Sequence, residues 1–260
     1  MTNSRILEIA LQQSAVDLNC APQDFCSGTA KVVLSQANPQ ARRYLKLPFF
    51  CDMVSYGSNV VVSADERIKD FMETYIRRCP PEHCFETPQL HLLEREFQKY
   101  GQSVCFMAEY FLPDLDRLKP LSCPLEMRLL TPHDFAELYL PQWSNALCRK
   151  RKELDRLAVA AVDNGTIVAL AGASADCDTM WQIGIDVLPA YRRQGIAAAL
   201  TAKLALEILA RNRVPFYCAA WSNIPSVRNA VRSGFRPAWA ELTAMDIKTV
   251  SDLQKEQENG

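Results

Sequence analysis

The sequence lacks an excess of charge of either sign. Its 29 lysine and arginine residues nearly balance its 30 aspartate and glutamate residues, which leaves a formal net charge of -1. Nucleic-acid-binding proteins usually show a basic surface, and this composition provides no general positive field. We therefore expect no nucleic-acid partner, and any anion must be recognised by a local group of residues.

Long apolar runs are also missing. No stretch approaches the length that spans a bilayer, and the first residues, Thr2-Asn-Ser-Arg5, precede an amphipathic stretch rather than the apolar core of a signal peptide. We expect a cytoplasmic protein with no membrane partner.

Paired cysteine motifs are absent although cysteine is not. The ten cysteines include no C-x-x-C pair, and a cytoplasmic chain of this kind is expected to keep them reduced. Cys79, His83, Cys84 and His91 lie close in sequence but lack the paired spacing of a zinc site. We expect no metal.

Hydrophobic periodicity predicts an α+β fold with a mixed central β-sheet flanked by helices. Asn164-Gly165 is the dipeptide of a tight antiparallel hairpin, and residues 181–187 alternate between apolar and other side chains. Helices are expected at 4–18, 63–78, 90–101, 142–153, 196–211 and 225–232, with a further start at Thr131-Pro132. Strands are expected at 49–56, 60–62, 104–111, 125–130, 157–162, 166–174, 181–187, 214–221 and 235–245.

The proline-rich stretch 113–124 indicates a domain boundary near residue 122. It separates a smaller α+β N-terminal domain, residues 1–122, from a C-terminal domain, residues 123–260. The first domain carries no motif that we can connect with chemistry.

Positive charge and a glycine meet at the start of a helix in Arg192-Arg193-Gln194-Gly195. The first amides of a helix have no acceptor within the helix and can bind phosphate oxygens, while glycine lets the backbone come close. The alternative is that two arginines merely cap a surface turn.

A second motif favours the anion site. Arg192-x-x-Gly195-x-Ala197 follows a strand that ends Val187-x-Pro189, and Asn223-x-x-Ser226-x-Arg228 is followed by Gly234-Phe235. Over residues 125–246 this pair of motifs resembles the GNAT superfamily of acyl-CoA-dependent N-acyltransferases.

The resemblance implies where acetyl-CoA would bind. Strands 181–187 and 214–221 would diverge to admit it. Backbone groups of Ile185 and Val187 would hold the pantetheine arm, and Asn223 would approach that arm from the other strand. The complete set of implied cofactor-binding residues is Ile185, Val187, Arg192, Arg193, Gln194, Gly195, Ile196, Ala197, Ala198, Asn223 and Ser226.

The sequence departs from the superfamily at the residue expected to protonate the leaving thiolate. Many members carry a tyrosine four residues before the glycine of the Gly-Phe turn, and here that position is Ala230. Tyr217 is the alternative acid, although an aromatic residue in a strand is more often part of the core. Asp186 is the first candidate for a base and Glu241 a weaker one, against the alternative that Asp186 is an ordinary hydrogen-bonded aspartate.

The predicted function is transfer of an acyl group, most simply acetyl, from acetyl-CoA to a primary amine by direct attack. The acceptor is a small-molecule amine or an amine of a protein or peptide. A non-catalytic acyl-CoA-binding sensor is the alternative. The N-terminal domain is either a degenerate copy of the same fold, which makes a monomer with an internal pseudo-dimer, or an unrelated cap over the acceptor; a homodimer is the other arrangement considered.

Overall fold

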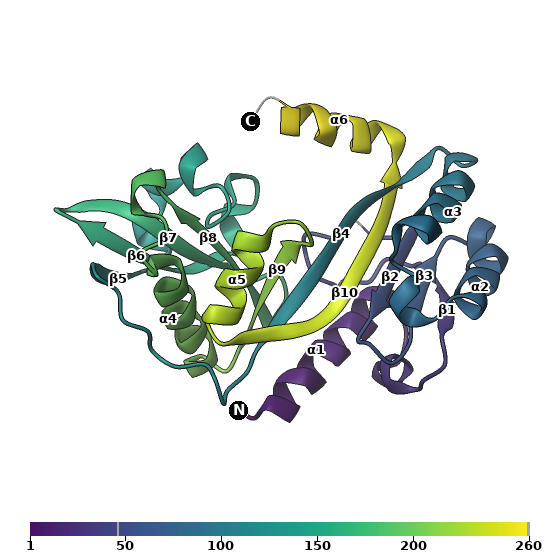
Figure 1. Cartoon of the computed structure of the whole chain (residues 1–260), viewed down its shortest axis with the longest axis horizontal. Coiled ribbons are helices and arrows are strands. Elements are labelled where there is room, and N and C mark those ends of the chain that lie inside the picture. The colour runs from purple at the N-terminus through teal and green to yellow at the C-terminus, as the bar shows by residue number, and fades with distance from the viewer. Residues whose placement is uncertain (46, 259–260) are drawn as a thin grey trace. The chain divides into compact units, whose positions relative to one another are not determined.

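The computed structural model describes residues 1–45 and 47–258, and within them it shows a mixed sheet flanked by helices (Figure 1). Ten strands follow one another in the order β1-β3-β2-β10-β4-β9-β8-β7-β6-β5. The strands are β1 (Lys31–Leu34), β2 (Cys51–Ser55), β3 (Val61–Ala64), β4 (Gln102–Pro113), β5 (Glu126–Leu130), β6 (Asp155–Asp163), β7 (Thr166–Ser174), β8 (Met180–Val187), β9 (Val214–Ala220) and β10 (Phe235–Asp246). The α-helices are α1 (Asn3–Leu18), α2 (Lys69–Arg78), α3 (Thr87–Gln98), α4 (Ile196–Ala210), α5 (Ile224–Arg232) and α6 (Ile247–Glu258). The expected α+β fold is confirmed.

The chain divides into two compact units, and neither unit begins or ends near residue 122. One contains Met1–Ala10 and Tyr110–Pro237, and the other contains Leu11–Glu109 and Ala238–Gly260. The second unit takes the C-terminal end of the chain because β10 pairs antiparallel with β2. A local sequence pattern does not show that the C-terminal strand pairs with a strand from the N-terminal part of the chain.

The unit that contains residues 110–237 has a core on each face of its strands. Alternate residues of β6 take part in the two cores: Leu157 and Val159 lie with α4, whereas Ala158 and Ala160 lie with Phe135 and Trp143. The period of two in a strand explains this division. Helix α4 therefore covers one face and residues 131–154 cover the other.

Residues 131–154 contain short 3₁₀ helices instead of the two α-helices expected there. These are Pro132–Asp134, Ala136–Leu138, Pro141–Trp143 and Arg149–Leu154. Thr131 and Asp134 form the capping box of the first one, so the start signal is real but the helix is only one turn long. Proline at position 141 and a non-helical backbone at Arg151 (φ -143°) interrupt any longer helix.

The unit that contains residues 11–109 places an apolar core on one face of β2, β3 and β10. Met53 and Leu242 pack there with Met72 of α2 and Phe97 of α3. The helix expected from residue 63 begins later than predicted, because Ser63 belongs to β3. Asp65 caps the next turn by accepting a hydrogen bond from the backbone N–H of Arg67.

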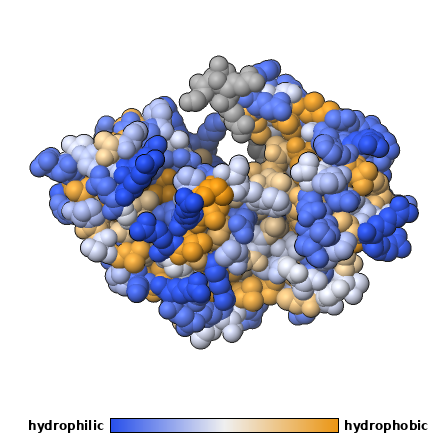
Figure 2. Space-filling model, in the orientation of Figure 1, coloured by the Kyte–Doolittle hydropathy of each residue, from blue (hydrophilic) through white to orange (hydrophobic). Residues whose placement is uncertain are grey.

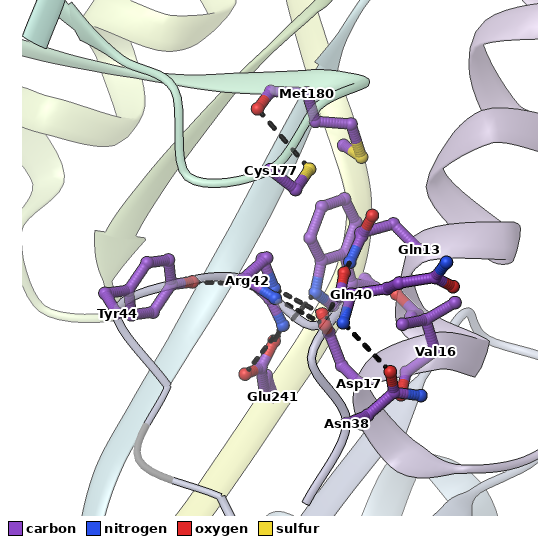
Figure 3. Close-up of polar contacts among 12 residues, drawn as sticks. Gln13, Val16, Asp17, Asn38, Gln40, Arg42, Tyr44, Cys177, Met180 and Glu241 are labelled. Carbon is purple, nitrogen blue, oxygen red and sulfur yellow. Dashed lines mark hydrogen bonds and ion pairs between the residues drawn. The ribbon is translucent and has the colours of Figure 1, made fainter. Parts of the chain in front are cut away.

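A buried ion cluster lies on the opposite face of the same strands (Figure 3). The Arg42 guanidinium bonds the Asp17 carboxylate through Nε and bonds Glu241 through Nη2, at 3.2 Å to Oε1 and 3.0 Å to Oε2. Its Nη1 donates to the Tyr44 hydroxyl at 2.7 Å, and Trp239 Nε1 donates to Glu241 Oε2 at 3.1 Å. The side chains of Arg42, Asp17 and Glu241 are 3%, 0% and 1% exposed. Glu241 is therefore committed to a buried ion pair, which argues against the weaker of the two expected bases.

A third carboxyl group, that of Asp52, lies near this cluster. Asp52 pairs with Thr243 across β2 and β10, and within the described residues neither of its oxygens has a hydrogen-bond partner. Burial, followed by the charge of Glu241, raises the pKa of Asp52 well above its usual range. This group keeps its proton at pH values at which exposed aspartates have lost theirs.

The surface mixes hydrophilic and hydrophobic residues on the face that Figure 2 shows. Within residues 1–45 and 47–258, no helix is both long enough and apolar enough to cross a membrane.

Candidate functional site

Strands β8 and β9 pair only over their first residues. The parallel register runs from Met180 opposite Val214 to Ile183 opposite Tyr217, and β8 then continues to Val187 while β9 continues to Ala220. The two strands thus part after Ile183 and Tyr217, three residues before Asp186. The resemblance implied such a divergence.

The edge of β8 beyond this point carries main-chain groups that face β9. Leu188 N–H donates to Val168 of β7, and main-chain groups alternate along a strand, so those of Ile185 and Val187 point to the other side. Arg192 Nε reaches the Val187 carbonyl there at 3.1 Å. The main-chain groups of Ile185 and Val187 therefore face away from β7, and contact of these groups with a ligand stays a prediction.

The segment between β8 and α4 is held in shape by local contacts. The Tyr191 hydroxyl donates to Asp163 Oδ2 at 2.7 Å, at the end of the β6–β7 hairpin. Gln194 Nε2 donates to the Ala190 carbonyl at 3.3 Å. Arg193 and Gly195 have φ values of 64° and 81°, the left-handed region that glycine adopts without strain. The turn thus presents a defined backbone at the start of α4.

The start of α4 has the features of an anion-binding site. The backbone N–H of Ala199 donates to the Gly195 carbonyl, so the amides of Ile196, Ala197 and Ala198 precede the first closed turn of the helix. Arg192 and Arg193 are exposed beside them. Amides with no acceptor within the helix, the positive end of the helix dipole and two guanidinium groups together fit a phosphate or pyrophosphate group.

Helix α5 supplies the remaining cofactor-binding residues that the motif predicted. The Asn223 side chain caps the helix by accepting a hydrogen bond from the Ser226 backbone N–H at 3.2 Å, which leaves its amide NH₂ as a donor. Ser226 is half-buried. Its hydroxyl lies 2.8 Å from the hydroxyl of Tyr217 on β9.

Tyr217 is 3% exposed, and its ring packs against Phe111 and Phe235. Burial raises the pKa of Tyr217, while its hydrogen bonds with Ser226 and Asn229 act in the opposite direction. Tyr217 is thus a core residue whose hydroxyl contacts Ser226, and its role as an acid stays a prediction.

Asp186 takes part in a structural contact. Its Oδ2 accepts hydrogen bonds from the backbone N–H groups of Asn145 and Ala146, both at 2.9 Å, and its Oδ1 accepts one from Asn145 Nδ2 at 2.6 Å. A carboxylate that already accepts three hydrogen bonds is poorly available as a base. The structure therefore favours the alternative interpretation of Asp186, a hydrogen-bonded aspartate that anchors a loop.

Two glycines allow the anchored loop to lie against the sheet. Gly172 of β7 and Gly184 of β8 are direct partners. A Cβ atom on Gly184 would lie 1.8 Å from the Asn145 carbonyl oxygen, and one on Gly172 would lie 1.8 Å from the Ala146 carbonyl oxygen. Only glycine permits this approach, so Gly172, Gly184 and Asp186 together fix residues 145 and 146 against β7 and β8.

Sequence reasoning missed Asn229 and Thr201. Asn229 Nδ2 donates to Thr201 Oγ1 at 3.1 Å and connects α5 with α4 next to Tyr217. The one signal in the sequence is that Asn229 follows Ser226 by three residues, which places both on the same side of a helix.

Two of the residues considered for a metal, His83 and Cys84, have other contacts. His83 Nδ1 lies 2.9 Å from Glu86 Oε1, and the Cys84 thiol donates to the Cys79 carbonyl at 3.5 Å. Within the described parts of the chain, no group of three or more histidine, cysteine, aspartate or glutamate residues could hold a metal ion.

Comparison with known proteins gives a family match over most of the chain. The model of the family described as GNAT acetyltransferase matches residues 54–239. The match starts well before residue 125, where the motif resemblance begins, and so includes much of the region that carried no motif. No curated protein sequence matches the chain.

Solved structures match parts of the chain at low identity. A protein described as a GNAT-family acetyltransferase from Novosphingobium aromaticivorans is 21% identical, with 55% of this chain and 66% of that one covered and a TM-score of 0.42. A GCN5-related N-acetyltransferase-like protein from Streptococcus suis is 21% identical, with coverages of 60% and 68% and a TM-score of 0.44. A GCN5-related N-acetyltransferase from Sphaerobacter thermophilus is 18% identical, with coverages of 73% and 72% and a TM-score of 0.45. The chain spans just under two thirds of the length of the first of these proteins.

Proposed function

Because the chain belongs to the GNAT acetyltransferase family, whose members typically use acyl-CoA, we propose that it transfers the acetyl group of acetyl-CoA to a primary amine. The observation that carries this proposal is the parting of β8 and β9 after Ile183 and Tyr217, next to the amides at the start of α4. The arrangement offers a slot for an extended arm and a site for its phosphate groups.

Each part of the ligand has a proposed partner. The pyrophosphate is held by the amides of residues 194–198 and by Arg192 and Arg193. Main-chain groups of Ile185 and Val187 bond the pantetheine arm from β8, and the amide NH₂ of Asn223 bonds it from the other side. Ser226 lies three residues after Asn223, in the first turn of α5.

The proposed chemistry is direct attack of the amine on the thioester, with no covalent intermediate on the protein. Holding the two groups in attack geometry can supply about 7 kcal/mol or more of the barrier. A free amine with a pKa of about 10.4 is neutral in only about one molecule in 2,500 at pH 7, so its proton must be removed first. Because Asp186 is committed to Asn145 and Ala146, we do not assign it that role, and we assign the proton for the leaving thiolate to Tyr217.

A non-catalytic acyl-CoA sensor is the second candidate. It is favoured by Ala230, which is fully buried and carries no proton donor where many members of the superfamily have tyrosine. The acceptor in the first proposal is a primary amine of a small molecule, a peptide or a protein.

A panel of amines tests the proposal. Purified protein is mixed with acetyl-CoA and with polyamines, amino acids, amino sugars or peptides that have a free N-terminus or lysine, and release of free thiol is measured. We expect at least one amine to raise thiol release above the rate without an amine, with the acetylated product found by mass spectrometry. Binding of acetyl-CoA without release for any amine would favour the sensor instead.

A further inference from the structure

We propose that Ser226 and Tyr217 form a two-hydroxyl relay that delivers a proton to the sulfur of coenzyme A as it leaves. This inference rests on the proposed function and concerns the same site. It assigns the contact with sulfur to Ser226 Oγ, with Tyr217 acting through it.

The two hydroxyl groups lie at the point where a thioester between the strands would need a proton. Tyr217 is the last residue of β9 in register with β8, and its hydroxyl is 2.8 Å from Ser226 Oγ. The phenol is buried whereas Ser226 is only half-buried, so Ser226 is the member of the pair that a ligand can reach. Ala230 lies one helical turn after Ser226 on the same side of α5 and has no polar side-chain atom.

Neighbouring side chains set the direction of the relay. The Asn229 amide has two N–H donors. One bonds Thr201 Oγ1 at 3.1 Å, and the other is available to the hydroxyl oxygen of Tyr217, whose pKa the Asn229 side chain lowers. When the phenol oxygen accepts from Asn229, Tyr217 donates its own proton to Ser226 Oγ. The Ser226 proton is then free to point toward the ligand.

Each proton that moves in the relay has a donor and an acceptor. As the C–S bond breaks, its electron pair goes to sulfur, Ser226 Oγ gives its proton to sulfur, and Tyr217 gives its proton to Ser226 Oγ. The phenolate then takes up, through solvent, the proton that the attacking nitrogen loses on becoming an amide. Burial raises the pKa of Tyr217, which keeps this proton in place at neutral pH until the thiolate develops.

Two hydroxyl deletions test the relay, with thiol release at saturating acetyl-CoA and amine as the readout. We expect Ser226→Ala and Tyr217→Phe each to lower kcat about 100-fold or more, the range of a general acid, while the KM for acetyl-CoA changes less than about threefold. The kcat of the double variant should lie within about threefold of the kcat of the slower single variant, because the two groups act as one unit. Ser226→Thr, which keeps a hydroxyl, should recover most of the activity.

Ser222→Ala is the matched control, because Ser222 is exposed just before Asn223 and lies outside the proposed machinery. Its kcat should equal that of the wild type. A kcat for Ser226→Ala within twofold of the wild type, or a threonine variant as slow as the alanine variant, would overturn the relay and leave the proposed function standing. Absence of amine-dependent thiol release by the wild type would instead overturn the proposed function and the relay with it.

Discussion

Replacing Arg42 by methionine is expected to destabilise the protein by about 3–5 kcal/mol. The change leaves the Asp17 and Glu241 carboxylates buried without their shared cation, since the Arg42 guanidinium bonds both and all three side chains are at most 3% exposed. Removing one partner of a buried ion cluster lowers the free energy of unfolding strongly, because an uncompensated charge stays buried. Replacing the whole cluster by apolar residues changes this free energy far less. Chemical denaturation followed by circular dichroism measures the loss.

Arg43→Met is the matched control, because Arg43 is the same residue type one position later and is exposed. It should change stability by less than about 0.5 kcal/mol. The triple variant Asp17→Asn, Arg42→Met, Glu241→Gln should recover much of the loss because it removes the uncompensated charges. If Arg42→Met is no more damaging than Arg43→Met, the cluster is not important for stability.

Gly184→Ala is expected to destabilise the protein by about 3 kcal/mol or more. The new Cβ would lie 1.8 Å from the Asn145 carbonyl oxygen, a backbone atom that cannot move without breaking the bonds between Asp186 and residues 145 and 146. Overpacking alone costs about 1–3 kcal/mol, and hydrogen bonds to a charged group contribute about 1.5–3 kcal/mol. The measurement is the denaturation midpoint at unchanged slope.

Gly165→Ala separates crowding from backbone strain. Gly165 has φ of 82°, and among the described residues a Cβ atom at this position would meet nothing within 4 Å. Alanine at this position should therefore lower the free energy of unfolding only by the cost of a left-handed backbone conformation, about 1–2 kcal/mol. Equal losses for the two variants would show that residues 145 and 146 move away from β8 at little cost.

The part of the site that follows directly from the sequence is local. Residues 181–187, 196–210 and 214–220 have clear periodicity, and Gly195 and Asn223 stand at the turns that start α4 and α5. Those signals predicted the elements, because each depends on neighbours within one or two turns. The parting of β8 from β9 was implied only by the resemblance to the GNAT superfamily.

The rest depends on contacts between distant residues. Asp186 is separated by 41 residues from Asn145, whose backbone it holds, and Arg42 by 199 from Glu241. No local pattern distinguishes an anchoring aspartate from a base. Residues 131–154 carry helix-start signals, but Gly172 and Gly184 let an irregular backbone pack on the sheet, where apolar contacts replace helix formation.

Thermal unfolding with and without acetyl-CoA tests whether acetyl-CoA binds at the turn before α4. A ligand at about 100 times its Kd adds about 2.7 kcal/mol of stability, which raises Tm by several degrees. Gly195→Asp places a carboxylate among the amides of residues 196–198, so this variant should melt as a folded protein but lose the shift, while Gly165→Asp in the β6–β7 hairpin should keep it. A wild type that shows no shift in Tm, or a Gly195→Asp variant that keeps the full shift, would show that acetyl-CoA does not bind at this turn.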